Sequence, residues 1–150
     1  MNSQQICLVQ ETFELVAPIA DIAATLFYQK LFDLDPSLRP LFPGDLKQQK
    51  VKLMQTLSAV ARGLHQIQKL LPVVEQLGQR HVAYGVKDEH YQTVGAALLW
   101  TLEQGLGDRY TPEVAAAWTA AYELLAGVMQ KAAARVEPVA DAIEDYQLIN

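Results

Sequence analysis

The stretch LLPVVEQLGQRHVAY, residues 70–84, carries the pattern that decides the fold. Leu70, Val74 and Leu77 recur at steps of three and four residues, which places them on one face of a helix. His81 follows Leu77 by four residues and therefore lies on the same apolar face. A lone inward histidine is more often a satisfied core side chain than a metal ligand, so this helix alone favours a structural role.

The same helical periodicity continues on both sides of this stretch, without strand-like alternation, internal repeats or a Gly/Ser linker. Proline, glycine and capping residues divide it into segments of unequal length. The expected helices start at Ser3, at Pro18 in a first turn, after Pro43-Gly44-Asp45, near Leu70, at the cap Asp88 and at Thr111-Pro112-Glu113, with a short piece from Pro36 to Phe42. Their expected ends are Asp35-Pro36, about Leu64, before Gly85 and near Gly105 and Gly107. The sequence therefore predicts an all-α single domain of six to seven helices over residues 1–136.

An acidic segment, residues 137–150, follows this domain. Its acidic residues are not balanced by any base after Arg135; they are Glu137, Asp141, Glu144 and Asp145. The segment is either a short docked helix or a frayed extension, and its composition favours the extension.

Composition narrows the classes of function. A chain of 150 residues can bury a core that encloses a small cofactor, and its net charge of −5 argues against nucleic acid or an anionic membrane surface as a partner. No window approaches a membrane span, and residues 1–5 are too polar for a signal peptide. Cys7 is the one cysteine, so we expect no internal disulfide and a cytoplasmic location.

Three further polar side chains share helix faces with apolar residues. Gln49 is in register with Leu53, and Tyr28 and Tyr91 lie on the apolar faces of the second and the next-to-last helix. Each alone fits a buried group paired with a backbone carbonyl. Together with His81 they place four polar groups on four long helices, which favours a shared ligand.

The sequence shows no motif for another kind of functional site. The sequence has no Gly-rich phosphate loop, no His-x-x-x-His metal pair and no nucleophile elbow. His65 and His90 fall near expected helix ends, where we expect them to be exposed. Lys47 and Lys50 fit the solvated face of a helix.

Several of these segments resemble the globins. The quoted residues are Leu26-Phe27-Tyr28, Leu31-Phe32, Asp35-Pro36 and Leu41-Phe42 for the second helix and its corner, and QRHVAYGVK (79–87) for the segment of the haem-binding histidine. The latter is especially similar to neuroglobins, whereas the pocket residues are closer to bacterial flavohaemoglobins and single-domain bacterial haemoglobins. Spacing agrees with that family, because 32 residues separate Gln49 from His81 and 14 separate Tyr28 from Phe42. The similarity covers about residues 5–132.

The resemblance implies a b-type haem (iron protoporphyrin IX), held without covalent attachment because the sequence has no Cys-x-x-Cys-His. His81 would be the proximal iron ligand, and Tyr28 and Gln49 would donate hydrogen bonds to the distal ligand. Leu53 matches the apolar distal residue that limits the space over the iron. The remaining haem contacts that the resemblance assigns are Phe42, Lys52, Leu77, Tyr84, Val86, Tyr91 and Val94.

Two departures from these relatives shape the expected function. Gln49 stands where neuroglobins carry a histidine that closes the sixth site of the iron, so an open ferrous site is expected. Ala133 stands where flavohaemoglobins carry a glutamate that makes the proximal histidine more electron-donating. The sequence also carries no flavin reductase segment, so redox turnover would need a separate reductase.

The leading hypothesis is reversible binding of oxygen, CO and NO, with nitric oxide dioxygenase activity given an external reductase. A haem-based gas or redox sensor, or a partner-binding globin module, is the alternative. A helical interaction protein without haem is the plainest reading of the same residues. We expect a monomer or a weak homodimer.

Overall fold

The computed structural model describes residues 1–135, which form six α-helices and four short 3-10 helices and contain no strand. The α-helices are α1 (Ser3–Val16), α2 (Ala20–Leu34), α3 (Lys47–Gly63), α4 (Ile67–Ala83), α5 (Asp88–Leu106) and α6 (Pro112–Ala133). The 3-10 helices are η1 (Ala17–Ile19), η2 (Pro36–Leu41), η3 (Leu64–Gln66) and η4 (Gly107–Arg109). The all-α class with six to seven helices is confirmed. The expected acidic extension, residues 137–150, lies outside the described residues.

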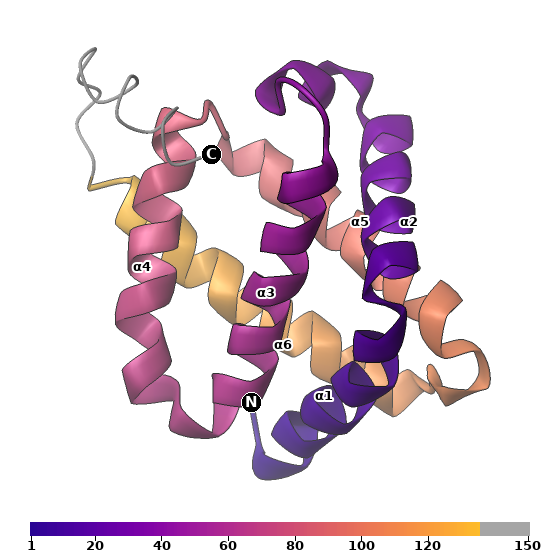
Figure 1. The fold of residues 1–150 in the computed structure, drawn as a ribbon. Helices are drawn as coiled ribbons and strands as arrows, with labels where there is room; N and C mark the ends of the chain where they lie inside the picture. Colours follow the sequence, from indigo (N-terminus) through magenta and orange to yellow (C-terminus); the bar gives the residue numbers. More distant parts are fainter. Residues whose placement is uncertain (136–150) are drawn as a thin grey trace.

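The helices pack chiefly in three pairs, α4 on α6, α2 on α5 and α1 on α6. Figure 1 shows the long α6, in orange to yellow, crossing behind α3 and α4, with α2 and α5 side by side at the right. The main core lies between α1, α2, α5 and α6 and is built from large apolar side chains. It includes Val9, Phe13, Phe27, Leu31, Leu98, Leu102, Val114 and Trp118.

Side-chain caps determine where the first and the last helix begin. Asn2, rather than the expected Ser3, caps α1: its side chain accepts a hydrogen bond from the Gln5 backbone at 2.8 Å, and the Gln5 side chain accepts from the Asn2 backbone at 3.1 Å. This reciprocal box satisfies two helix-end N–H groups, which a serine one residue later would not. Thr111 caps α6 as expected, accepting from the backbone of Val114 at 3.2 Å.

Two expected helix starts are shifted. Pro18 lies in η1, so α2 begins at Ala20 rather than with proline in its first turn. The N-cap of α5 is Lys87, and Asp88 is the first helical residue. The Nδ1 atom of His90 accepts a hydrogen bond from the Lys87 backbone at 3.0 Å, which satisfies the N–H of the cap residue itself. Asp88 instead stabilises the first turn through the helix dipole.

The end of α4 follows the sequence prediction closely. Gly85 has a φ of +86°, the left-handed conformation that glycine adopts without strain. The Val86 N–H donates to the His81 carbonyl at 3.0 Å, and the Gly85 N–H donates to the Val82 carbonyl at 3.1 Å. These two bonds form a Schellman motif, which ends the helix and fixes the backbone of His81.

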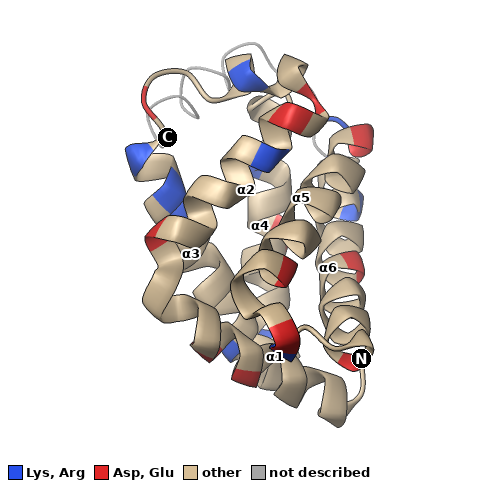
Figure 2. Ribbon diagram, turned by 90° about the vertical axis from the view of Figure 1, so that its right-hand side faces the viewer, with Lys and Arg blue, Asp and Glu red and all other residues tan. Residues whose placement is uncertain are grey.

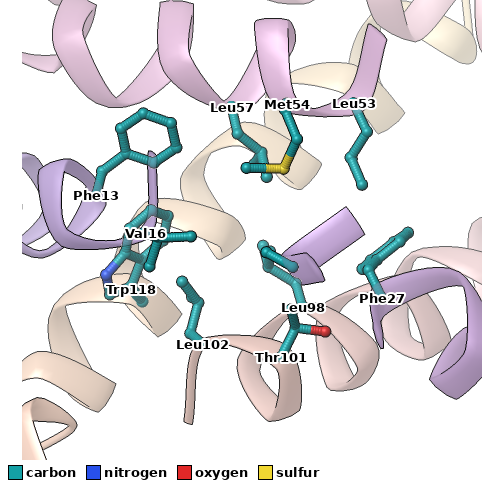
Figure 3. A pocket seen from close by; sticks show the side chains of 11 residues that line it. Phe13, Val16, Phe27, Leu53, Met54, Leu57, Leu98, Thr101, Leu102 and Trp118 are labelled. Carbon is teal, nitrogen blue, oxygen red and sulfur yellow. The ribbon is translucent and has the colours of Figure 1, made fainter. Parts of the chain in front are cut away.

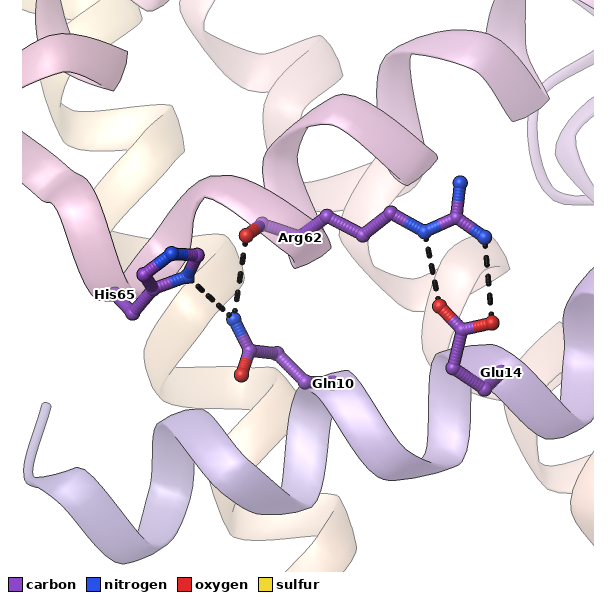
Figure 4. A network of polar contacts seen from close by, with 4 residues as sticks. All are labelled: Gln10, Glu14, Arg62 and His65. Carbon is purple, nitrogen blue, oxygen red and sulfur yellow. Dashed lines mark hydrogen bonds and ion pairs between the residues drawn. The ribbon is translucent and has the colours of Figure 1, made fainter.

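Polar contacts hold α1 against the rest of the fold. The buried indole of Trp118 donates to the Thr12 hydroxyl at 2.8 Å, which joins α6 to α1. At the surface, Figure 4 shows Gln10 bridging to His65 Nδ1 and the Arg62 carbonyl, beside the paired Arg62 and Glu14. This network joins α1 to the end of α3, so the two helices keep a fixed relation.

The charged residues are spread over several helices. In Figure 2, basic and acidic residues are both scattered over the visible face, and most of the ribbon carries neither. None of the helices in residues 1–135 combines the length and apolarity that a bilayer span requires.

Candidate functional site

The candidate site lies at one end of the α3–α4 pair. The two helices run in opposite directions because only η3 joins them, and Figure 1 shows the start of α3 and the end of α4 at the same end of the molecule. Gln49 is in the first turn of α3, and His81 is in the last turn of α4. Residues predicted from separate parts of the sequence are therefore brought to one end of the fold.

One ring nitrogen of His81 is already used within its own helix. Nδ1 lies 2.6 Å from the carbonyl oxygen of Leu77, one turn earlier, which fits an Nδ1–H donor. Burial lowers the pKa of His81, and the bond to Leu77 opposes part of that fall. The favoured form is thus a neutral imidazole with Nε2 available to a metal, the arrangement common for histidine ligands whose other nitrogen is hydrogen-bonded.

A glycine sets the position of the helix that carries His81. A Cβ atom on Gly78 would lie 2.4 Å from the Met129 carbonyl oxygen, so α4 and α6 approach too closely for any other residue. Gly78 is three residues before His81, and the crossing therefore fixes where the histidine lies. Sequence reasoning missed this residue, because a glycine inside a helical pattern signals a close approach only once the partner helix is known.

Tyr28 and Gln49 form a hydrogen-bonded pair between α2 and α3. Tyr28 is only 3% exposed, and burial raises its pKa to about 12. A side-chain hydrogen bond with Gln49 lowers the pKa again in part. The net effect of burial is that the phenol stays protonated at neutral pH.

Phe42 packs against this pair. Its ring meets the Tyr28 ring edge to face at 5.5 Å and the Phe32 ring at 5.8 Å. Arg39 fixes the corner by donating to the Phe42 carbonyl and, at 3.0 Å, to the Gly44 carbonyl. Sequence reasoning also missed Arg39, since an exposed arginine before a proline gives no periodic signal.

The apolar face of α3 has little protein over it. Of its 17 residues only Ala61 is fully buried, although the predicted stripe through Gln49, Leu53 and Leu57 is present. The apolar residues expected around the ligand are half-buried as well; they are Leu53, Leu77, Val86 and Val94. Partly exposed apolar side chains on several elements fit a flat, largely apolar cofactor such as haem.

Behind this face lies a small cavity with apolar walls. Figure 3 shows Leu53, Met54 and Leu57 from α3 directed toward Phe27, Leu98 and Leu102 across it. The hydroxyl of Thr101 in its wall donates to the Ala97 carbonyl at 2.8 Å, so its hydrogen bond is made inside α5. Leu53, one turn after Gln49 on α3, is one of the residues that line this cavity.

The other predicted site residues differ in their burial and in their contacts with His81. Tyr84 lies beside His81, with ring centroids 5.7 Å apart, and Tyr91 is buried on α5. Lys52 and Val86 are half-buried, and their place relative to the haem stays a prediction. His65 is exposed as expected, whereas His90 is half-buried. Within residues 1–135, no three His, Cys, Asp or Glu side chains gather into a metal site, so a metal here would rely on the single His81.

Three solved structures illustrate the proteins that share this fold. An engineered carbene transferase, described as a putative nitric oxide dioxygenase from Rhodothermus marinus, superposes with a TM-score of 0.81 at 23% identity, covering 99% of this chain and 98% of that one. A bacterial globin from Campylobacter jejuni gives 0.79 at 22% identity, covering 89% and 97%. A flavohemoglobin from Malassezia yamatoensis gives 0.75 at 19% identity, covering 90% of this chain and 37% of that one. The fold is that of bacterial globins.

Sequence comparison gives the family. The Globin family model matches residues 25–129, and this chain belongs to the globin family. A flavohemoprotein of Vibrio cholerae is 31% identical over 131 residues, which cover 85% of this chain and 33% of that protein. One from Pseudomonas putida is 34% identical over 136 residues, covering 86% and 34%. The chain thus spans about a third of the length of the curated relatives it matches.

Proposed function

We propose that this globin binds oxygen and other diatomic ligands, such as CO and NO, reversibly at a b-type haem. The observation that carries the proposal is the pairing of Tyr28 with Gln49 at the same end of α3–α4 as His81. We also propose that the protein is located in the cytoplasm.

His81 Nε2 would hold the haem iron, because Nδ1 is bound to the Leu77 carbonyl. When bound, haem supplies a ferrous iron that takes up diatomic ligands. Phe42 would pack on the haem face, and Leu53 would limit the space on the distal side. The remaining wall and edge contacts would come from Lys52, Leu77, Tyr84, Val86, Tyr91 and Val94.

Tyr28 would be the main distal donor. Because burial raises its pKa to about 12, the phenol stays protonated at neutral pH. Gln49 would donate its amide N–H to the phenol oxygen, and a phenol that accepts one hydrogen bond donates a stronger one. A diatomic ligand with partial negative charge would be stabilised by this donor in apolar surroundings, which predicts slow oxygen release.

A second, catalytic function is favoured by the comparisons. The curated relatives are flavohemoproteins, and the Rhodothermus marinus neighbour is described as a putative nitric oxide dioxygenase. We extend the proposal to conversion of nitric oxide to nitrate by oxygen, with electrons from a separate reductase. A nitric oxide consumption assay with a supplied reductase separates this activity from plain ligand binding.

An absorption spectrum tests the haem site itself. Protein purified with haem or reconstituted with haemin should show an intense Soret band that shifts with CO. His81→Ala should lose this band or greatly weaken it, whereas His65→Ala, which changes an exposed histidine, should keep it. A colourless protein that takes up no haemin would contradict the proposal.

A further inference from the structure

The guanidinium of Arg39 holds the corner that joins η2 to α3, residues 42–46. It donates one hydrogen bond to the Phe42 carbonyl and a second, at 3.0 Å, to the Gly44 carbonyl. Its central carbon also lies 5.6 Å from the centroid of the Phe32 ring. Because residues 42–46 belong to no helix, this exposed side chain supplies partners for two carbonyls that no helix satisfies.

One path of contacts leads from Arg39 to Tyr28. Phe42, whose carbonyl accepts from Arg39, packs its ring edge to face against Tyr28, with the ring centroids 5.5 Å apart. The Phe32 ring lies beside the guanidinium, 5.8 Å from the Phe42 ring and 6.0 Å from the Tyr28 ring. Since packed side chains transmit small shifts, a displacement of the Phe42 backbone would move a ring that bounds the Tyr28 phenol.

A second path leads from Arg39 to Gln49. Gly44, whose carbonyl accepts from Arg39, has a φ of +83°, the left-handed conformation that glycine adopts without strain. The next side chain, Asp45, accepts a hydrogen bond from the Lys47 N–H at 2.8 Å, where α3 begins. Gln49 lies in the first turn of that helix. The bond to the Gly44 carbonyl therefore helps to determine where this first turn lies.

The two paths end on the two members of the distal pair. Tyr28 is on α2 and Gln49 is on α3, so their separation depends on how the chain between these helices is held. We propose that Arg39 is a positioning residue: by holding two corner carbonyls together, it keeps Tyr28 and Gln49 paired and thereby slows ligand release. The inference rests on the proposed function. An arginine is required because its planar fork donates in two fixed directions, whereas a lysine carries one compact ammonium on a flexible stem.

The test variant is Arg39→Lys, and its matched control is Arg62→Lys, at the exposed arginine in the last turn of α3 that pairs with Glu14. In the haem-free proteins, hydrogen–deuterium exchange of the backbone amides of residues 42–49 should be faster in Arg39→Lys and unchanged in Arg62→Lys. With haem, Arg39→Lys should release oxygen about three- to fivefold faster. It should also shift the C–O stretching frequency of the CO complex, which reports polar contacts with the ligand and does not follow stability alone.

A double variant shows whether Arg39 acts through Tyr28. The distal hydroxyl is already missing in Tyr28→Phe, so adding Arg39→Lys to this variant should speed oxygen release no further. Stopped-flow displacement of oxygen by CO gives the rates for the parent protein, both single variants and the double variant.

Three results would overturn the inference. Unchanged amide exchange at residues 42–49 would show that Arg39 does not hold the corner. Unchanged oxygen release and C–O frequency in Arg39→Lys would show that the corner does not position the distal pair. Equal acceleration in the parent and Tyr28→Phe proteins would show that the effect does not pass through Tyr28. If the parent protein takes up no haem, its absorption spectrum contradicts the proposed function, whereas amide exchange in the haem-free protein still decides whether Arg39 holds the corner.

Discussion

The two sides of this globin bury their helices very differently. On the core side, α5 fully buries seven of its 19 residues and α6 six of its 22. On the site side, α3 fully buries one of 17 and α4 three of 17. All four helices carry apolar stripes, so the difference lies in what covers those stripes. The core side is covered by protein, whereas the apolar face of the site side is left partly exposed.

Leucine truncations give the largest expected effect and can break this comparison directly. Leu102, on α5, is 2% exposed, and Leu102→Ala should lower the unfolding free energy of the haem-free protein by about 2–5 kcal/mol. Leu57, on α3, is half-buried, so Leu57→Ala should cost well under half as much. Urea denaturation of both variants measures the difference. Equal losses would mean that α3 is packed as tightly as α5.

Glycine substitutions sharpen the comparison at the α4–α6 crossing, the one place where the site side is packed tightly. Gly78→Ala should destabilise by about 1–3 kcal/mol, because the new methyl group overlaps the Met129 backbone. Gly127→Ala, on α6 where a Cβ atom meets nothing within 4 Å, should be neutral or stabilise by about 0.5–1 kcal/mol. Thermal denaturation distinguishes them. If Gly78→Ala leaves the stability unchanged, the α4–α6 crossing does not fix the position of His81.

Tyr28→Phe tests whether the site side binds a ligand at Tyr28. Loss of a hydrogen bond to a partly charged ligand should speed oxygen release about tenfold. Tyr110→Phe, at the end of η4, serves as the control and should leave release unchanged. Stopped-flow displacement of oxygen by CO gives both rates. Equal rates in Tyr28→Phe and the parent protein would remove Tyr28 from the distal site.

Local rules in the sequence predicted most of the fold. The Thr111 cap, the Gly85 stop and the all-α class follow from short-range chemistry, and each is confirmed. The predicted cap of α5 was wrong: Lys87 is the N-cap and Asp88 is the first helical residue, while His90 accepts the Lys87 N–H from within the first turn. Asn2 likewise replaces Ser3, since only Asn2 can form a reciprocal box with Gln5.

The candidate site was predictable to a smaller extent. The resemblance supplied the pairing of Tyr28 with Gln49, and the structure brings these two together. Gly78 and Arg39 could not be identified, because their importance depends on a helix crossing and a corner carbonyl that no periodicity reveals.

The smallest expected effect is a pH dependence that belongs to the site side. Burial lowers the pKa of His81 in the folded protein, so below its ordinary value of about 6.5 the unfolded chain binds a proton that the folded chain resists. The stability of the haem-free protein should therefore be complete above about pH 6.5 and fall as the pH drops below it. His81→Gln cannot titrate and should lose part of this fall, measured by urea denaturation at about pH 7.5 and about pH 5.5. If His81→Gln loses as much stability at low pH as the parent protein, other groups cause the loss. The imidazole would then not be held neutral by burial, which would weaken the assignment of His81 as a metal ligand.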